Sequence, residues 1–154
     1  MAPHIPGAAR LTTSQAGAGI RALRWLTLLL LCAAYLQGGL NKLLDFGGAV
    51  AEMQHFGLQP AVPLAAAVII GELGAVAMVL AGRLRWLGAA WLALFTVAAS
   101  FIANRYWEMA GMERFAAANS FYEHLGLAGG FLLVAWHDLA AKSGKEGAWH
   151  AERH

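Results

Sequence analysis

The sequence is poor in cysteine, in charge and in the short motifs that bind phosphate or support nucleophilic catalysis. Cys32 is the only cysteine among 154 residues, which excludes an internal disulfide, a Cys-x-x-Cys thiol pair and four-cysteine iron–sulfur ligation within the chain. The six histidines show no tight metal-ligand spacing, and neither a Gly-rich phosphate loop nor a serine-triad pattern is present. We therefore predict no metal site, no covalently bound cofactor and no redox centre in this chain.

Charged residues make up only 13% of the chain, whereas 59% of its residues are hydrophobic. This composition is unlike that of a soluble domain of similar size. The net charge of +2 is also too small to indicate nucleic acid as a partner. We therefore expect one all-α integral membrane domain whose main partner is the lipid bilayer.

Apolar runs predict a transmembrane four-helix bundle. At about 1.5 Å rise per residue, the second run alone reaches about 28 Å, close to the hydrocarbon thickness of a bilayer. The connecting segments, including the one over residues 104–120, are predicted to be loops. We divide the chain into a flexible lead (1–20), the transmembrane domain (21–138) and a polar tail (139–154). The apolar runs are Trp25–Leu40, Val62–Leu80, Leu84–Ala103 and Phe121–Trp136.

Lysine and arginine are distributed unevenly across the predicted bundle. Arg21 and Arg24 precede the first run as in a secretory signal peptide, but three further runs favour a retained anchor. With the N-terminus in the cytoplasm, eight of the eleven Lys and Arg residues fall on that side, as the positive-inside rule favours. We therefore predict a multi-pass protein with both termini in the cytoplasm. The eight are Arg10, Arg21, Arg24, Arg83, Arg85, Lys142, Lys145 and Arg153, and the other three are Lys42, Arg105 and Arg114.

Glu72 is the only ionisable residue within the second apolar run. A carboxyl group in lipid is costly unless it is protonated or partnered, so we expect Glu72 to face other helices. Counting helix rise from the predicted inner edges brings three polar side chains near its depth. These candidate hydrogen-bond partners are Tyr35, Gln37 and Thr96.

The protonation state of Glu72 depends on its distance from a cation. Lys42 and Arg105 are expected to lie too near the outer surface for direct pairing, so we expect a protonated carboxyl group. Two interpretations remain open. Glu72 is either a structural carboxyl group that locks helices together or part of a buried ligand or proton site.

Further polar residues gather at the outer ends of the predicted helices. Such residues are usually interfacial, with long side chains that reach toward water. The alternative is a polar mouth that receives a head group or a quinone ring, with Glu72 deeper below it. His124 would then serve as a hydrogen-bond donor or a proton acceptor. The group consists of Gln37, Asn41, Lys42, Ser100, Asn104, Arg105, Glu123 and His124.

Small residues recur at every fourth position on the second and fourth runs. Ala67, Gly71 and Ala75 form one series, and Gly126 and Gly130 form the other. This spacing lets the backbones of membrane helices approach closely. Packing within one bundle accounts for both series, and contact between copies in a homo-oligomer is the alternative.

Several short motifs give the chain a family resemblance. They are GLNKL (39–43) at the end of the first run, GLQP (57–60) before the second, ELG (72–74) within it, LAGR (80–83) after it and the segment 119–130 ending in LAGG. In their order and spacing the chain resembles the DoxX family of small four-span bacterial membrane proteins, from about Arg24 to Trp136. Family members often carry a lysine–asparagine pair at the place of Glu123-His124, so no family role is transferred to that position.

The resemblance implies a location in the bacterial inner (cytoplasmic) membrane. The family takes its name from a membrane subunit associated with thiosulfate:quinone oxidoreduction. This implies a membrane subunit of, or accessory to, a quinone-linked oxidoreductase system, with quinone as ligand, an oxidoreductase subunit as partner and at most a subunit's part in catalysis. Two alternatives stay open: a non-catalytic membrane organiser that recruits a partner protein, and a transporter of a small solute or protons. The transporter would use the buried carboxyl group, although the sequence shows no broken helix or inverted repeat.

Overall fold

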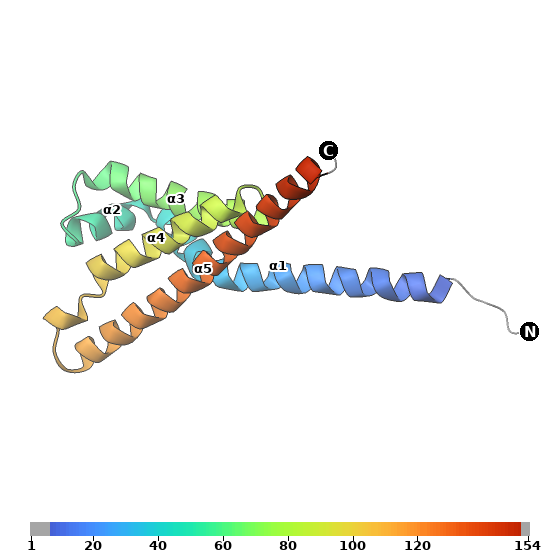
Figure 1. Ribbon diagram of the computed structural model, residues 1–154. Helices are drawn as coiled ribbons and strands as arrows, with labels where there is room; N and C mark the ends of the chain where they lie inside the picture. The colour runs from blue at the N-terminus through green and yellow to red at the C-terminus, as the bar shows by residue number, and fades with distance from the viewer. Residues whose placement is uncertain (1–6, 152–154) are drawn as a thin grey trace, which may run out of the picture.

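A computed structural model describes the backbone of residues 7–151 and the side chains of residues 17–143. It confirms the all-α class, and the described residues contain no strand. Figure 1 shows the helices in order along the chain. They are α1 (Gly7–Leu44), α2 (Phe46–His55), α3 (Ala61–Ala81), α4 (Arg85–Ala103), the short 3-10 helix η1 (Tyr106–Glu108) and α5 (Gly111–Ala151).

The bundle is formed by α3, α4, α5 and the C-terminal half of α1. Helices α4 and α5 pack along each other most extensively, and α3 lies between α1 and α4. The N-terminal half of α1 extends away from the other helices, and α5 crosses α1 within its C-terminal half, where Gly130 lies beside Leu31 (Figure 1). Helices α1 and α5 touch only around this crossing. Beyond it, the N-terminal part of α1 and the C-terminal part of α5 diverge from each other.

The core is made mostly of small residues and a few larger apolar ones. Cys32, Val79, Leu92 and Phe131 are fully enclosed. The backbones of α3 and α4 approach so closely at Gly88 that an added Cβ atom would lie 2.7 Å from the Ala75 carbonyl oxygen. Many large apolar side chains instead point outward, including Leu30, Ile70, Leu94 and Leu132. This arrangement is typical of a protein whose outer surface faces lipid.

Among the described residues, three helical segments are long and apolar enough to cross a membrane, so the protein is a multi-pass membrane protein by helix composition. They cover Gly17–Leu44, Ala61–Ala81 and Arg85–Glu108. The predicted fourth run, Phe121–Trp136, lies within α5. It packs on the other helices through Phe121, Ala128, Phe131 and Ala135. Its crossing of the membrane and the orientation of the termini remain predictions.

Several predicted boundaries differ from the structure. The backbone is helical from Gly7, so the part of the predicted flexible lead from Gly7 to Ile20 continues α1, whereas residues 1–6 lie outside the described residues. Helix α5 runs from Gly111 to Ala151, through most of the predicted 104–120 loop and into the polar tail. The side chains of Arg10, Lys145 and Arg153 lie outside the described residues.

Helix α2 was not predicted, because it falls within a polar segment. Asp45 precedes it, and the Asp45 carboxylate accepts a hydrogen bond from the Gly48 N–H at 2.9 Å, as an N-cap residue does. Ala49 and Met53, four residues apart, turn one face of the helix toward α3 and are buried. This short helix therefore covers the outer part of the bundle.

The turn from α3 to α4 is tight, as the sequence predicts. Gly82 ends α3 with φ of 75°, a left-handed conformation that favours glycine, and its N–H donates to the Met78 carbonyl. Helix α4 then begins without a capping side chain of its own, because Leu84 occupies the N-cap position.

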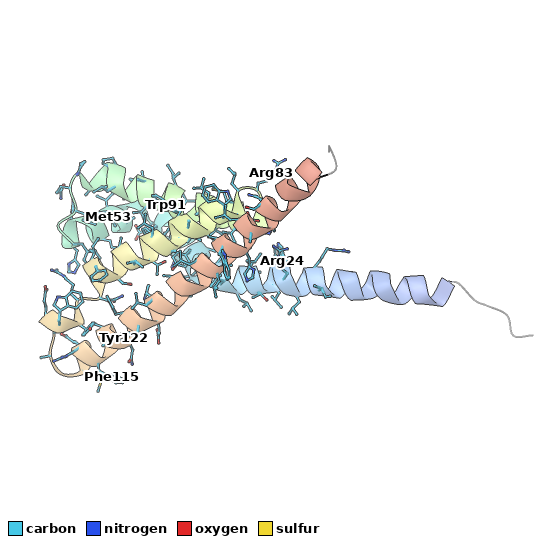
Figure 2. All side chains as sticks on the ribbon, in the orientation of Figure 1. Arg24, Met53, Arg83, Trp91, Phe115 and Tyr122 are labelled. Atoms are coloured by element: carbon cyan, nitrogen blue, oxygen red, sulfur yellow. The ribbon has the colours of Figure 1, made fainter. Side chains whose placement is uncertain are left out.

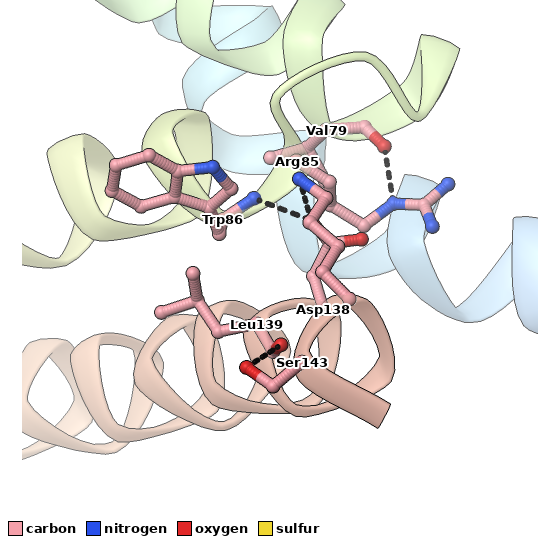
Figure 3. A network of polar contacts seen from close by, with 7 residues as sticks. Val79, Arg85, Trp86, Asp138, Leu139 and Ser143 are labelled. Atoms are coloured by element: carbon pink, nitrogen blue, oxygen red, sulfur yellow. Dashed lines mark hydrogen bonds and ion pairs between the residues drawn. The ribbon is translucent and has the colours of Figure 1, made fainter. Parts of the chain in front are cut away.

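Helix α5 supplies the missing cap. The Asp138 carboxylate accepts a hydrogen bond from the Trp86 N–H at 3.3 Å and pairs with Lys142 at 3.0 Å (Figure 3). The Arg85 Nε–H donates to the Val79 carbonyl at 2.9 Å. These contacts fasten the start of α4 to both α3 and α5.

Candidate functional site

Glu72 lies on α3 where α1 passes closest to it. Its side chain is buried, with 4% of the residue exposed. Gly39 on α1 makes this approach feasible, because an added Cβ atom there would lie 2.8 Å from Leu73 Cδ2 and 3.6 Å from Glu72 Cβ. The carboxyl group is therefore directed into the bundle, as predicted, rather than toward lipid.

A lysine ammonium group lies beside this carboxyl group. Lys42 Nζ is 3.6 Å from Glu72 Oε2. The prediction that Lys42 lies too near the outer surface to pair with Glu72 is therefore wrong, and with it the ground for expecting a protonated carboxyl group. The long, flexible stem of Lys42 lets its ammonium group reach Glu72 from the outer end of α1.

Tyr35 and Thr96 contact each other instead of Glu72. The Thr96 hydroxyl donates to the Leu92 carbonyl one turn earlier, so the Tyr35 hydroxyl must donate to Thr96 Oγ1. Both residues are buried, and the Tyr35 ring packs edge-on against Phe131 at 5.3 Å between centroids. The proposed hydrogen bonds from Tyr35 and Thr96 to Glu72 are thus absent among the described contacts, although all three residues line the same cavity.

This cavity has a volume of about 450 Å³, within the range of pockets that hold small molecules. Most of its wall is apolar, with Phe95 and Ile102 from α4, Val68 from α3 and Met53 and Phe56 from α2 and its C-cap. Against this apolar wall stand a few polar groups. They are Tyr35, Lys42, Glu52, Glu72, Thr96, Asn104 and His124.

Only some of the predicted mouth residues line the cavity. Lys42, Asn104 and His124 do so. The other candidates lie elsewhere. Gln37 is exposed, Asn41 lines a neighbouring surface pocket, and Arg105 is exposed and pairs with Glu108 at 3.2 Å.

Ser100 is also outside the cavity wall and is fully buried in the helix packing. Among the described residues, its hydroxyl oxygen has no hydrogen-bond partner. Since it neither lines the cavity nor holds a neighbouring group, we assign Ser100 no part in the site.

His124 lines the cavity, and one of its ring nitrogens is engaged by its own helix. Nδ1 contacts the Ser120 carbonyl oxygen on the preceding turn of α5. A carbonyl oxygen only accepts, so Nδ1 carries the hydrogen and Nε2 remains to accept from a ligand in the neutral ring or to donate in the protonated ring. This fits the predicted role of His124 as a hydrogen-bonding group.

Sequence reasoning missed the contribution of α2. Glu52, Met53 and Phe56 complete the wall of the cavity opposite α4 and α5. The available signal was the N-capping Asp45 followed by apolar residues at helical spacing, Ala49 and Met53. Lys42 and Glu52 also line a surface pocket beside Asn41 and Asp45, so the two pockets share these residues.

Comparison with known proteins supports the resemblance drawn from the motifs. The sequence model of the DoxX family matches residues 23–105. This match covers α1 from Leu23 onward, α2, α3 and α4, and so includes most of the cavity wall, whereas the expected similarity over residues 106–136 lies beyond it. Comparisons with curated proteins and with solved structures give no match. Because the family match extends over more than half of the 154 residues, the chain belongs to the DoxX family.

Proposed function

We propose that this protein is a membrane subunit of, or accessory to, a quinone-linked oxidoreductase system, and that it binds a quinone in the cavity beside Glu72. A single observation carries the proposal. A largely apolar cavity of about 450 Å³ is lined by the Lys42–Glu72 pair and also by Asn104 from the end of α4 and His124 from α5.

The residues of the cavity suit the two ends of a quinone. Quinone carbonyl oxygens accept hydrogen bonds, and the Lys42 ammonium group, the Asn104 amide and a protonated His124 are donors. The hydrophobic tail requires apolar surface, which Val68, Phe95 and other wall residues supply. Binding by a few placed polar groups within an apolar pocket is the usual arrangement for small-molecule sites.

The quinone would supply the redox chemistry. The protein would bind the quinone and transfer protons to or from it. Glu72 provides a carboxyl group inside the cavity, and Lys42 lies 3.6 Å from it. Lys42 and Glu52 face both the cavity and the adjoining surface pocket, so a proton held at Glu72 has titratable groups between it and the exterior. Electrons would come from or pass to a partner subunit.

Thermal unfolding of the purified protein with and without a short-chain quinone tests the proposal. Wild type is compared with Glu72→Gln, which preserves shape and a hydrogen bond, and with His124→Ala. Glu123→Gln, the same chemical change as Glu72→Gln at an exposed position of α5 outside the cavity, is the matched control. We expect the quinone to raise the melting temperature of wild type and of the control and to raise it less in the two cavity variants.

Two results would contradict quinone binding in this cavity. One is that quinone raises the melting temperature of none of the proteins, and the other is that it raises all four alike. Either result would favour the alternative of a non-catalytic membrane organiser, for which the Lys42–Glu72 pair would be a structural contact between α1 and α3.

A further inference from the structure

A second cavity lies at the opposite end of the bundle, between the diverging ends of α1 and α5. Its volume is about 620 Å³. The floor includes Leu28 from α1 and Val134 from α5, close to where the two helices cross. Arg24 lies on α1 just beyond this crossing (Figure 2). The cavity thus opens in the angle that α1 and α5 form.

The polar groups around this cavity are all basic or neutral. Arg24 comes from α1, Arg85 from the start of α4 and His137 from α5, and no acidic side chain is among the described residues that line it. The closest acidic group in the sequence of α5, Asp138, is already engaged by Lys142 and by the Trp86 N–H. Among the described residues, the wall of the cavity itself therefore carries no carboxylate, and the nearest one, Asp138, interacts with the charge of Arg85 from outside the wall.

The two guanidinium groups differ in how firmly they are held. The Arg85 Nε–H donates to the Val79 carbonyl, which fixes the stem and leaves its terminal N–H groups for another acceptor. Arg24 is exposed and can adjust to a ligand. A pair of arginines on separate elements is suited to a phosphate group, because each planar guanidinium can donate two parallel hydrogen bonds.

The position of the cavity along the helices corresponds to the edge of the membrane. Arg24 precedes the first apolar run, Arg85 begins α4 and His137 follows the fourth apolar run. Trp25, Trp86 and Trp136 adjoin these three residues in the sequence, and tryptophan is enriched at the level of lipid head groups. The floor residues Leu28 and Val134 lie farther along the apolar runs, toward the membrane interior.

We propose that this cavity is a binding site for an anionic phospholipid, with its phosphodiester group between Arg24 and Arg85 and an acyl chain along Leu28 and Val134. Basic pockets between membrane helices on the cytoplasmic side are suited to such head groups. A lipid with a glycerol head group fits better than a choline lipid, whose ammonium group would face Arg24, Arg85 and His137. This site is separate from the cavity beside Glu72 and does not depend on quinone binding.

Thermal unfolding in detergent with added dioleoyl phosphatidylglycerol or dioleoyl phosphatidylcholine tests the lipid site. Wild type is compared with Arg24→Gln and with Arg21→Gln, a matched control that removes an exposed arginine one turn earlier on α1, outside the cavity. We expect phosphatidylglycerol to stabilise wild type and Arg21→Gln more than phosphatidylcholine does. In Arg24→Gln, we expect the apparent affinity for phosphatidylglycerol to be about tenfold lower, since charge-assisted hydrogen bonds are lost.

Three outcomes would overturn this proposal. Equal stabilisation of wild type by both lipids would remove the preference for anionic head groups. Equal weakening in Arg24→Gln and Arg21→Gln would indicate diffuse attraction to a charged surface. Stabilisation by inorganic phosphate equal to that by phosphatidylglycerol would indicate a site for free anions. If Arg24→Gln is not recovered folded, His137→Gln replaces it, with the same expected direction and a smaller loss.

Discussion

At the scale of single residues, the buried contact between Tyr35 and Thr96 is unsymmetrical. The Thr96 hydroxyl donates to the Leu92 carbonyl and accepts a hydrogen bond from the Tyr35 hydroxyl. Tyr35 therefore needs Thr96 as its acceptor, whereas Thr96 does not need Tyr35 as its acceptor. Removal of the tyrosine hydroxyl leaves Thr96 bonded to its own helix. Removal of the threonine hydroxyl leaves the tyrosine donor without its acceptor, and an unsatisfied buried group costs more than a lost hydrogen bond.

We therefore predict that Thr96→Val lowers the free energy of unfolding more than Tyr35→Phe. The expected losses are about 1–3 kcal/mol for Thr96→Val and about 1 kcal/mol for Tyr35→Phe. In the double variant the loss should be smaller than the sum, because the orphaned hydroxyl is then absent. The measurement is unfolding of all four proteins in the same detergent.

Ser100→Ala provides the matched control for this double-mutant cycle. Ser100 lies one turn after Thr96, is equally buried and has no hydrogen-bond partner among the described residues. Its loss should leave stability unchanged or slightly increased, since a buried polar group without a partner is unfavourable. Equal destabilisation by Thr96→Val and Ser100→Ala would show that the contact with Tyr35 contributes nothing specific.

At the scale of helices, the backbones of α3 and α4 approach each other closely at Gly88. An added Cβ atom would lie 2.7 Å from the Ala75 carbonyl oxygen and 2.9 Å from Met78 Cβ. The backbone cannot yield as a flexible side chain can, so the helices would have to move apart. Gly126 on α5 differs, because its added Cβ atom would meet nothing within 4 Å.

Gly88→Ala should therefore lower the free energy of unfolding by about 1–3 kcal/mol, the usual cost of overpacking. Gly126→Ala, the same chemical change in open space, should be neutral or stabilising by up to about 1 kcal/mol, because alanine favours helix more than glycine does. The comparison is made by thermal unfolding of both variants and wild type. A Gly126→Ala variant as unstable as Gly88→Ala would contradict the packing described for α3 and α4.

The cap that α5 provides to α4 predicts a dependence of stability on pH. Burial alone would raise the pKa of Asp138, but hydrogen bonds from Lys142 and the Trp86 N–H, together with the charge of Arg85, leave this pKa below its ordinary value. Because the pKa of Asp138 is lower in the folded protein than in the unfolded protein, its ionised form stabilises the fold. The full stabilisation is present above the pKa of the unfolded protein, about 3.9. This stabilisation is lost as the pH falls through the folded pKa.

Asp138→Ala should cost about 0.5–2 kcal/mol near neutral pH, as the removal of an N-cap does. Asp138→Asn retains an acceptor for the Trp86 N–H but loses the charge that pairs with Lys142, so its cost should be smaller. Unfolding measured from pH 7 down to pH 2 should show the difference between wild type and Asp138→Asn shrinking below about pH 3.9. A difference that stays constant over this range would mean that the charge of Asp138 does not contribute.

The apolar runs predict the positions of the long helices well. They do not predict the helical structure of the polar segments that connect these runs. Each run is a nearly continuous apolar segment, and such a segment has few structures available in lipid other than a helix. Helix α2 was not predicted because Glu52, Gln54 and His55 give the segment a polar composition. Its burial depends on the contact of Ala49 and Met53 with α3. The full length of α5 was not predicted because its ends are polar; its middle packs along α4, and both of its ends extend beyond that shorter helix.

The candidate site was predictable in part. The depth of Tyr35, Glu72 and Thr96 follows from helix rise, and all three do line one cavity. The Lys42–Glu72 pair could not be predicted in this way, because a helix-depth count treats side chains as points at their own Cα level. Gln37 was misplaced for a related reason, since depth alone does not say which face of α1 a residue occupies.

At the scale of the whole molecule, labelling of single cysteines reports on the number of membrane crossings and on the side of each terminus. The charge bias predicts four crossings with both termini in the cytoplasm. Single cysteines at Gly111 and Ser143, introduced into a Cys32→Ser background, report on the two ends of α5. Position 111 should react with an impermeant reagent in intact cells whose outer membrane, if present, is permeabilised, whereas position 143 should react only after lysis.

Labelling of position 143 in intact cells would contradict the predicted orientation. It would also move the cavity of Arg24 and Arg85 to the non-cytoplasmic side of the membrane. Equal labelling of both positions would instead indicate that α5 does not cross the membrane and lies against α4 at one surface.

Photo-cross-linking shows whether a quinone occupies the cavity beside Glu72. Purified protein is irradiated with an azido-quinone, and the modified residues are located by mass spectrometry. We predict modification of the cavity wall on α2 and α4, around Met53, Phe56 and Ile102, that excess unlabelled quinone suppresses. Modification spread over the lipid-facing residues Ile70, Leu94 and Leu132, or unaffected by competing quinone, would contradict the claim.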